Sequence, residues 1–180
     1  MTYDVRVLRA GDVTAFREIR LEALLHHPGA YGSTYAQWVD QPIEHYLSRI
    51  DDGGIFGLFV DELLQGILAY DRETGGNARH RASLHAAYVR PPLRGKGAID
   101  ALVGAVVARG RSDGLAQLEL TVAADHPAAE AAYRRCGFVP VARFPRAMVR
   151  SGVEPEMGGQ AAQDGYVDEI LMILALDGPV

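Results

Sequence analysis

Residues 82–109 read Ala82-Ser-Leu-His-Ala-Ala-Tyr-Val89, then Arg90-Pro-Pro-Leu-Arg-Gly-Lys-Gly97, then Ala98-Ile-Asp-Ala-Leu-Val-Gly-Ala-Val-Val-Ala-Arg109. The pattern predicts an apolar strand, a turn with two glycines and three cations, and a helix that opens directly from the turn. The first N–H groups of a helix lack intrahelical acceptors, and the helix dipole adds partial positive charge there. Because Gly95 and Gly97 let the backbone approach a ligand closely, we expect the turn to bind a phosphate or pyrophosphate.

Two common phosphate-binding motifs do not fit this turn. A P-loop needs Ser or Thr after its Gly-Lys pair, and Gly97 stands there instead. A dinucleotide-binding fingerprint needs a third glycine, and Asp100 occupies that position. On these residues alone, an ordinary strand, turn and helix whose glycines only shape the turn remains an alternative.

Length and composition indicate one soluble globular domain over residues 1–180. The chain is 48% hydrophobic and 23% charged, with a net charge of −5. It has no basic block, so we expect no nucleic-acid partner. A lone cysteine, Cys136, and the absence of a long apolar run favour a cytoplasmic protein that does not enter the membrane.

Hydrophobic periodicity predicts an α/β (α+β) chain of about seven strands and about four helices. We expect strands over 5–8, 54–60, 63–70, 82–89, 116–122, 138–144 and 166–176, and helices over 13–27, 43–50, 98–110 and 125–136. The strand–helix–strand unit over 82–122 requires a parallel pair, and the short connections elsewhere favour antiparallel pairing. Residues 151–165 are expected to form a long loop. Four charged residues of the first helix are expected on its solvent face: Arg17, Glu18, Arg20 and Glu22.

The turn resembles the acetyl-coenzyme A loop of the GNAT superfamily of N-acetyltransferases, usually written Gln/Arg-x-x-Gly-x-Gly/Ala. Here that loop is Arg94-Gly-Lys-Gly97, with Val89 and Pro91 before it. The first four positions of the pattern fit. The sixth position holds Ile99, and the small residue, Ala98, comes one position early.

A second motif resembles the same superfamily. His126-Pro-Ala-Ala-Glu-Ala-Ala-Tyr-Arg-Arg-Cys-Gly-Phe138 is similar to the pattern Asn-x-x-Ala-x-x-Leu-Tyr-x-x-x-Gly-Phe. Four positions match: Ala129, Tyr133, Gly137 and Phe138. His126 replaces the Asn, and Ala132 replaces the Leu. With the predicted element order, this resemblance implies the GNAT acyl-CoA N-acyltransferase fold, a mixed and mostly antiparallel sheet, in a single N-acetyltransferase domain.

The resemblance implies acetyl transfer from acetyl-CoA, as co-substrate, to a primary amine of a small molecule or peptide. Direct attack of the amine on the thioester requires no metal and no covalent enzyme intermediate. Backbone amides from Arg94 to Ala98 are expected to hold the pyrophosphate, and Val89 to pair with the pantetheine arm. The full set of expected cofactor-binding residues is Tyr88, Val89, Arg94, Gly95, Lys96, Gly97, Ala98, His126, Ala129 and Tyr133.

The chemistry requires two proton transfers. The leaving thiolate needs a proton, and by resemblance Tyr133 is the general acid; the alternative is a tyrosine that only packs in the core. The amine is mostly ammonium at neutral pH, so a base must take its proton. His85 is the first candidate, because Leu84-His85-Ala86 resembles arylalkylamine acetyltransferases, whose histidine works in proton removal. His85 should share a strand face with Val89 if no bulge intervenes.

Other candidates for the base remain open. His85 could be a structural histidine, in which case Glu119 on the neighbouring parallel strand is the next candidate. Asp168 and Glu169 stand as charges inside the last apolar strand and are a further pair. A solvated strand face would explain at least one of these two.

The acceptor site is expected between the first two helices. By resemblance, this segment borders the acceptor pocket, and it carries four candidate contacts: Tyr31, Ser33, Thr34 and Tyr35. The acidic net charge favours small amines, polyamines or basic peptide ends over acidic acceptors. Two rival functions are a non-catalytic acyl-CoA-binding sensor or scaffold, and a structural domain that binds no CoA. The sequence leaves open whether the chain forms a homodimer.

Overall fold

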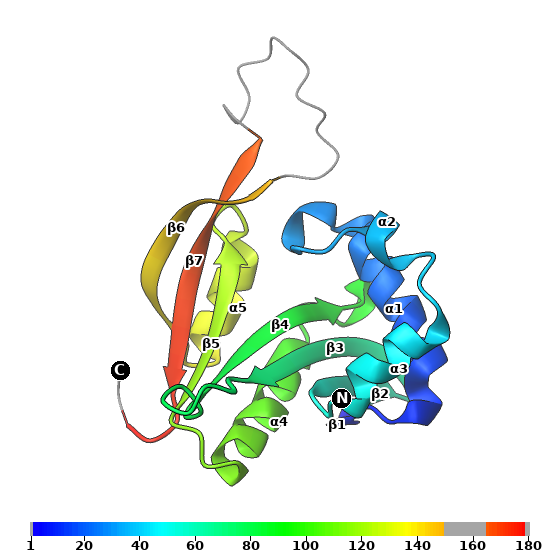
Figure 1. Ribbon diagram of the computed structural model, residues 1–180, viewed down its shortest axis with the longest axis horizontal. Coiled ribbons are helices and arrows are strands. Elements are labelled where there is room, and N and C mark those ends of the chain that lie inside the picture. The colour runs from blue at the N-terminus through cyan, green and yellow to red at the C-terminus, as the bar shows by residue number, and fades with distance from the viewer. Residues whose placement is uncertain (1, 150–164, 179–180) are drawn as a thin grey trace.

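The computed structural model describes residues 2–149 and 165–178 and shows one seven-stranded sheet with helices on both faces (Figure 1). The strands are β1 (Asp4–Val7), β2 (Ile55–Val60), β3 (Leu63–Arg72), β4 (Arg81–Val89), β5 (Gln117–Ala123), β6 (Val139–Val149) and β7 (Tyr166–Ala175). The helices are α1 (Val13–His26), α2 (Tyr35–Trp38), α3 (Ile43–Asp51), α4 (Ala98–Ser112) and α5 (Pro127–Arg135). The loop expected over 151–165 lies, apart from Gly165, outside the described residues.

The sheet has the order β1-β2-β3-β4-β5-β7-β6. Its pairs are antiparallel except β4 with β5, which α4 connects as a parallel crossover. The predicted α/β class, with a mixed and mostly antiparallel sheet, is therefore confirmed. The one-turn helix α2 was not predicted, because four residues are too few to show helical periodicity. None of the described helices is long and apolar enough to cross a membrane.

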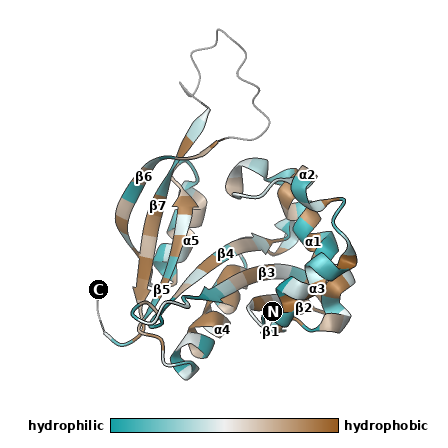
Figure 2. Ribbon diagram, in the orientation of Figure 1, coloured by the Kyte–Doolittle hydropathy of each residue, from teal (hydrophilic) through white to brown (hydrophobic). Residues whose placement is uncertain are grey.

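Two hydrophobic clusters, one on each face of the sheet, hold the layers together. Leu102 and Val106 of α4 pack with β2, β3 and β5 on one face. Ile19 of α1 and Tyr46 of α3 pack with β2 and β3 on the other. Figure 2 shows the matching pattern, with hydrophobic residues along the central strands and hydrophilic residues on the outer sides of the helices. Because side chains alternate along a strand, β2 and β3 contribute residues to both clusters.

The turn between β2 and β3 confirms the predicted hairpin. Val60 pairs with Leu63, and the two connecting residues, Asp61 and Glu62, have φ of 49° and 64°. Positive φ at both central positions matches the twist of a two-residue hairpin. Neither residue is glycine, so this turn retains backbone strain.

The parallel pair β4–β5 is short and the two strands then diverge. Pairing covers only residues 81–83 of β4 and 117–119 of β5, although the strands continue to Val89 and Ala123. Figure 1 shows β4 turning away from β5 beyond this point. Beyond residue 83, β4 therefore presents a backbone edge that β5 does not cover.

Candidate active site

The turn after β4 presents unpaired backbone N–H groups at the start of α4. A 3₁₀ turn over Pro91–Leu93 leads into Gly95 and Gly97, whose φ values are 71° and 80°. Gly97 is the N-cap of α4, and the first helical bond runs from Ala101 to its carbonyl. Within the described chain, five N–H groups have no protein acceptor: those of Gly95, Gly97, Ala98, Ile99 and Asp100. Such a group of amides at a helix N-terminus suits an anion.

The remaining atoms of the turn shape it. The amides of Arg94 and Lys96, both expected to meet the pyrophosphate, instead donate to the carbonyls of Pro91 and Leu93. The Arg94 guanidinium turns back to the Val89 carbonyl, with Nε to oxygen at 2.9 Å. The Lys96 carbonyl accepts a 2.8 Å hydrogen bond from the Tyr3 hydroxyl. Two of the expected amides are therefore used inside the turn.

The strand end before the turn is fixed by an ion pair from α1. Arg90 and Glu22 form a salt bridge at 2.8 Å, and the Tyr88 hydroxyl donates to the same carboxylate at 2.8 Å. Burial and this bond raise the pKa of Tyr88 to about 12. The Tyr88 side chain thus faces α1, so it is the backbone of this residue that borders the open edge of β4.

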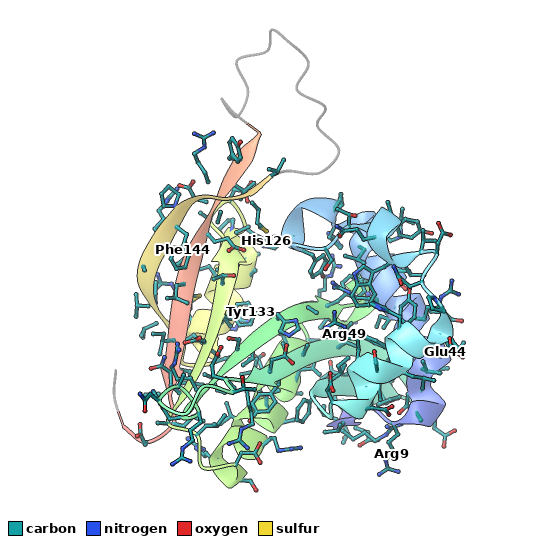
Figure 3. All side chains as sticks on the ribbon, viewed as in Figure 1. Arg9, Glu44, Arg49, His126, Tyr133 and Phe144 are labelled. Atoms are coloured by element: carbon teal, nitrogen blue, oxygen red, sulfur yellow. The ribbon has the colours of Figure 1, made fainter. Side chains whose placement is uncertain are left out.

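Helix α5 places the second motif opposite that edge. The His126 imidazole caps the helix by accepting from the Ala129 amide at 3.1 Å, the N-cap role that an asparagine also fills. Tyr133 follows on α5 and packs edge-on against Phe138, with ring centroids 5.9 Å apart. Figure 3 shows His126 and Tyr133 lying toward β4.

The Tyr133 hydroxyl is free to donate. Tyr133 is buried, at only 9% exposed. No hydrogen bond joins its hydroxyl to any residue in the described parts of the chain. Burial raises the pKa of Tyr133, and the neighbouring Tyr31 raises it further. Tyr133 belongs to the cluster on the α4 face of the sheet, and Tyr31 packs against the cluster on the opposite face.

A bulge in β4 separates His85 from Val89. Ala86 has φ of 54°, and the register with β3 shifts between Ile67 and Ala69. His85 consequently faces α1 while Val89 packs against the α4 cluster. The two residues do not share a face, because the bulge changes the alternation of the strand.

His85 is paired with a carboxylate. Its Nε2 lies 2.6 Å from Oδ2 of Asp71, which stands at the end of β3. Both side chains are exposed to solvent, at 49% and 62%. The imidazole therefore has an orienting partner and a route for protons to water.

Of the other candidate bases, Glu119 and Asp168 are engaged by arginines, and Glu169 lies on β7 opposite Phe144 of β6. Glu119 accepts from Arg81 at 3.0 Å and lies on the paired part of β5. Asp168 accepts from the side chain of Arg143 at 2.8 Å on the β6–β7 pair. Of these four candidates, the structure places only His85 beside the cavity described next.

A cavity of about 110 Å³ lies between α1, α3 and the bulged strand. Its lining consists of Phe16, Arg20, Ser33, Trp38, Arg49, Ile55, Ile67, Ala69, His85 and Ala86. Of the expected acceptor contacts, only Ser33 lines the cavity. Tyr31 stacks on Arg20, Thr34 caps α2 through the Gln37 amide, and Tyr35 lies within α2.

Among the lining residues that were missed at the level of sequence, three carry a cation or an indole ring: Arg20, Trp38 and Arg49. The expectation that Arg20 lies on the solvent face of α1 is wrong, since it is 5% exposed. Arg20 stands four residues after Phe16 and four before Leu24, which are both buried. This spacing places it in the apolar stripe and was the signal available.

Comparison with known proteins places this arrangement in a family. The profile described as the acetyltransferase (GNAT) family matches residues 15–138. The chain belongs to the GNAT acetyltransferase family. The match spans both motifs, from α1 to the Gly137-Phe138 pair that follows α5.

Solved GNAT structures share the fold. A putative acetyltransferase, yncA, from Salmonella typhimurium, solved with acetyl-CoA, has a TM-score of 0.78 at 20% identity, covering 100% of this chain and 97% of that one. An N-acetyltransferase from Staphylococcus aureus Mu50 has 0.77 at 15% identity, covering 98% and 99%. A phosphinothricin acetyltransferase from Sinorhizobium meliloti, in complex with acetyl-CoA, has 0.75 at 20% identity, covering 97% and 89%. No curated protein matches the sequence significantly.

Within the GNAT pattern, the departure at Ile99 is accommodated by the fold. The Ile99 side chain is partly buried and packs against the cluster on the α4 face. Its backbone N–H remains among the five free amides. The larger side chain therefore turns away from the amides rather than covering them.

Proposed function

We propose that this GNAT protein transfers the acetyl group of acetyl-CoA to a primary amine by direct attack. The observation that carries the proposal is the opening where β4 and β5 diverge. The free amides of the turn lie at the end of β4, and α5 presents the Tyr133 hydroxyl, which has no partner in the described chain. An anionic thioester co-substrate needs those two features together. The acetyl-CoA complexes of the Salmonella and Sinorhizobium proteins support the same co-substrate here.

The amides of the turn would hold the pyrophosphate. Gly95, Gly97 and Ala98 supply three of the free N–H groups, and the dipole of α4 adds to their attraction. The pantetheine arm would run along the uncovered edge of β4 near Val89 by strand-like hydrogen bonds. That path leads the thioester toward Tyr133.

Tyr133 would protonate the leaving sulfur. Attack of the amine forms the C–N bond, and the C–S bond breaks with its electron pair on sulfur. A thiolate in a buried site is costly, so a neighbouring donor lowers the barrier. The Tyr133 hydroxyl has this proton available because it has no hydrogen-bond partner in the described chain, and a phenol is protonated at neutral pH.

His85 would take a proton from the acceptor ammonium, which leaves the free amine to attack the thioester. An imidazole ring can accept a proton and pass it to water. Asp71 orients the ring at 2.6 Å and stabilises the imidazolium that forms. We favour His85 over Glu119, because the Glu119 carboxylate already accepts two hydrogen bonds from Arg81.

Calorimetric titration with acetyl-CoA, together with thermal shift, tests the first half of the proposal. We expect roughly micromolar binding and a melting point that rises with ligand. An amine panel with thiol-release detection tests the second half. Binding without turnover of any amine would favour an acyl-CoA-binding sensor or scaffold, and no binding would remove the CoA assignment itself.

A further inference from the structure

Among the residues that the structure describes, Arg20 is a buried cation without an anionic partner. Its guanidinium lies between two rings, with its central carbon 4.9 Å from the centre of Tyr31 and 4.8 Å from that of Trp38. Nε and Nη1 are buried and find no hydrogen-bond acceptor in the described chain. Unsatisfied buried charge is costly, and such groups are usually paired in native proteins. The structure thus keeps two donors of Arg20 available beside the cavity.

In the described part of the chain, the cavity lining around Arg20 adds positive charge and no negative charge. Arg49 of α3 lines the same cavity, with its guanidinium 5.9 Å from the Trp38 ring (Figure 3). Burial and the like charge of Arg49 lower the pKa of Arg20. The hydroxyls of Tyr31 and Tyr46 donate elsewhere, to the carbonyls of Ala87 and Trp38. Among the described residues, no Asp or Glu lines the cavity.

We propose that Arg20 and Arg49 bind the carboxylate of the acceptor, so that the substrate is a small amino-acid-like molecule with both an amine and a carboxylate. This inference rests on the proposed acetyl transfer and names its substrate class. It reverses the expectation from net charge, because the local charge of the cavity is opposite to that of the whole chain. Guanidinium groups are well suited to carboxylates, and the bonds they form are charge-assisted.

The rest of the cavity fits this substrate. His85 lines the same space as the two arginines, so a molecule held by its carboxylate would present its amine to the base. Phe16, Ile55 and Ile67 give it an apolar wall for a side chain. The volume of about 110 Å³ is below the roughly 300 Å³ at which pockets for drug-sized ligands begin. A single amino acid suits this size better than a peptide.

The first test uses the intact protein and pairs of acceptors. Each L-amino acid is compared with its carboxamide, which keeps the amine and side chain and removes the negative charge. We expect kcat/KM for thiol release to fall about ten- to a hundredfold in the carboxamide, as expected for loss of a charge-assisted hydrogen bond. Equal or faster turnover of the carboxamides, or of polyamines, would overturn the inference and leave acetyl transfer intact.

The second test uses variants. Arg20→Met and Arg49→Met should each abolish most of the preference for carboxylates while leaving acetyl-CoA affinity unchanged, and Arg20→Lys should restore part of it. Arg9→Met is the matched control, since Arg9 is exposed and lies away from the cavity (Figure 3). A preference that survives in both Met variants would overturn the assignment. If Arg20→Met does not fold, Arg49→Met and the acceptor pairs still decide.

A third measurement separates this inference from the proposed function. Calorimetric titration of N-acetyl amino acids into the CoA-bound protein measures the affinity of the proposed carboxylate site and requires no turnover. Binding that weakens about tenfold or more in Arg49→Met supports the inference even if no acceptor in the panel reacts. Binding of CoA without binding of any N-acetyl amino acid or free amino acid would overturn it. Failure to bind CoA at all would count against the proposed function instead.

Discussion

The hydroxyl of Tyr31 donates a 2.9 Å hydrogen bond to the carbonyl oxygen of Ala87, 56 residues further along the chain. Ala87 directly follows the bulged residue of β4, Ala86, whose φ is 54°. The Tyr31 ring also covers the guanidinium of Arg20. One side chain therefore fixes the segment between α1 and α2 to the strand that carries His85, and a non-glycine residue in a left-handed conformation is held in place beside it.

Replacing Tyr31 with Phe should loosen this link. The change keeps the ring over Arg20 but leaves the Ala87 carbonyl without its donor, so we expect the free energy of unfolding to fall by about 1 kcal/mol. The acceptor KM should rise while acetyl-CoA affinity stays the same. Urea unfolding and steady-state kinetics measure both. Tyr35→Phe is the control, because no hydrogen bond of the Tyr35 hydroxyl is present in the described chain, and equal effects in the two variants would contradict the prediction.

Replacing Tyr133 with Phe should lower kcat while acetyl-CoA affinity is nearly unchanged. Loss of a general acid typically costs about 10²- to 10⁴-fold. Rapid-quench or steady-state assays at saturating co-substrate give kcat, and calorimetry gives the affinity. Tyr70→Phe is the matched control, since Tyr70 is also buried but donates to Asp113 just beyond the end of α4. An unchanged kcat in Tyr133→Phe would remove this residue from the mechanism.

Replacing Gly97 with Asp should abolish acetyl-CoA binding. The change adds a side chain at φ of 80° and a negative charge at the N-terminus of α4, where the pyrophosphate would lie. Gly114→Asp controls for backbone strain, because Gly114 has φ of 71° beyond the opposite end of α4. Titration calorimetry of both variants decides; retained binding in Gly97→Asp would show that the turn has another role.

The local features of this fold could be read from sequence because each has a nearby signal. The hairpin at Asp61-Glu62 is a two-residue gap between apolar runs, and the glycines before Ala98 mark the start of α4. The bulge at Ala86 has no such signal, since neither glycine nor proline accompanies it. The register shift with β3 and the Tyr31 bond accompany the bulge, and neither is local in sequence.

Charged residues were harder to assign than apolar ones. Glu119 looked free along its own strand, but Arg81 pairs with it from β4. Arg20 looked like part of a wet helix face, yet aromatic rings from Tyr31 and Trp38 enclose it. In both cases a partner distant in sequence determines the role of the charge, and only the fold reveals that partner.

The strained hairpin offers a route to higher stability. Glu62 has φ of 64°, a conformation that glycine adopts without penalty. Glycine relieves this strain, and the greater freedom of the unfolded chain offsets part of the gain. We therefore expect Glu62→Gly to raise the free energy of unfolding by about 0.5–1 kcal/mol in net terms. Glu18→Gly in α1 is the control and should be destabilising by about 1 kcal/mol. Thermal and urea unfolding measure both, and a loss of stability in Glu62→Gly would contradict the prediction.

His27 should make stability depend on pH. Burial lowers its pKa, and the charges of Arg94, His26 and His126 lower it further. Arg94 Nη2 lies 2.9 Å from His27 Nε2 and can only donate, so Nε2 must be unprotonated.

The unfolded chain therefore binds a proton to His27 at a higher pH than the folded chain does. The stability that neutral His27 provides is present above the ordinary histidine pKa of about 6.5 and is lost as the pH falls through the lower folded value. Urea unfolding at several pH values should show that the stability of the wild type relative to His27→Gln declines on acidification. A difference between the two proteins that does not change with pH would contradict this, because Gln cannot titrate and every other ionisable group is common to both.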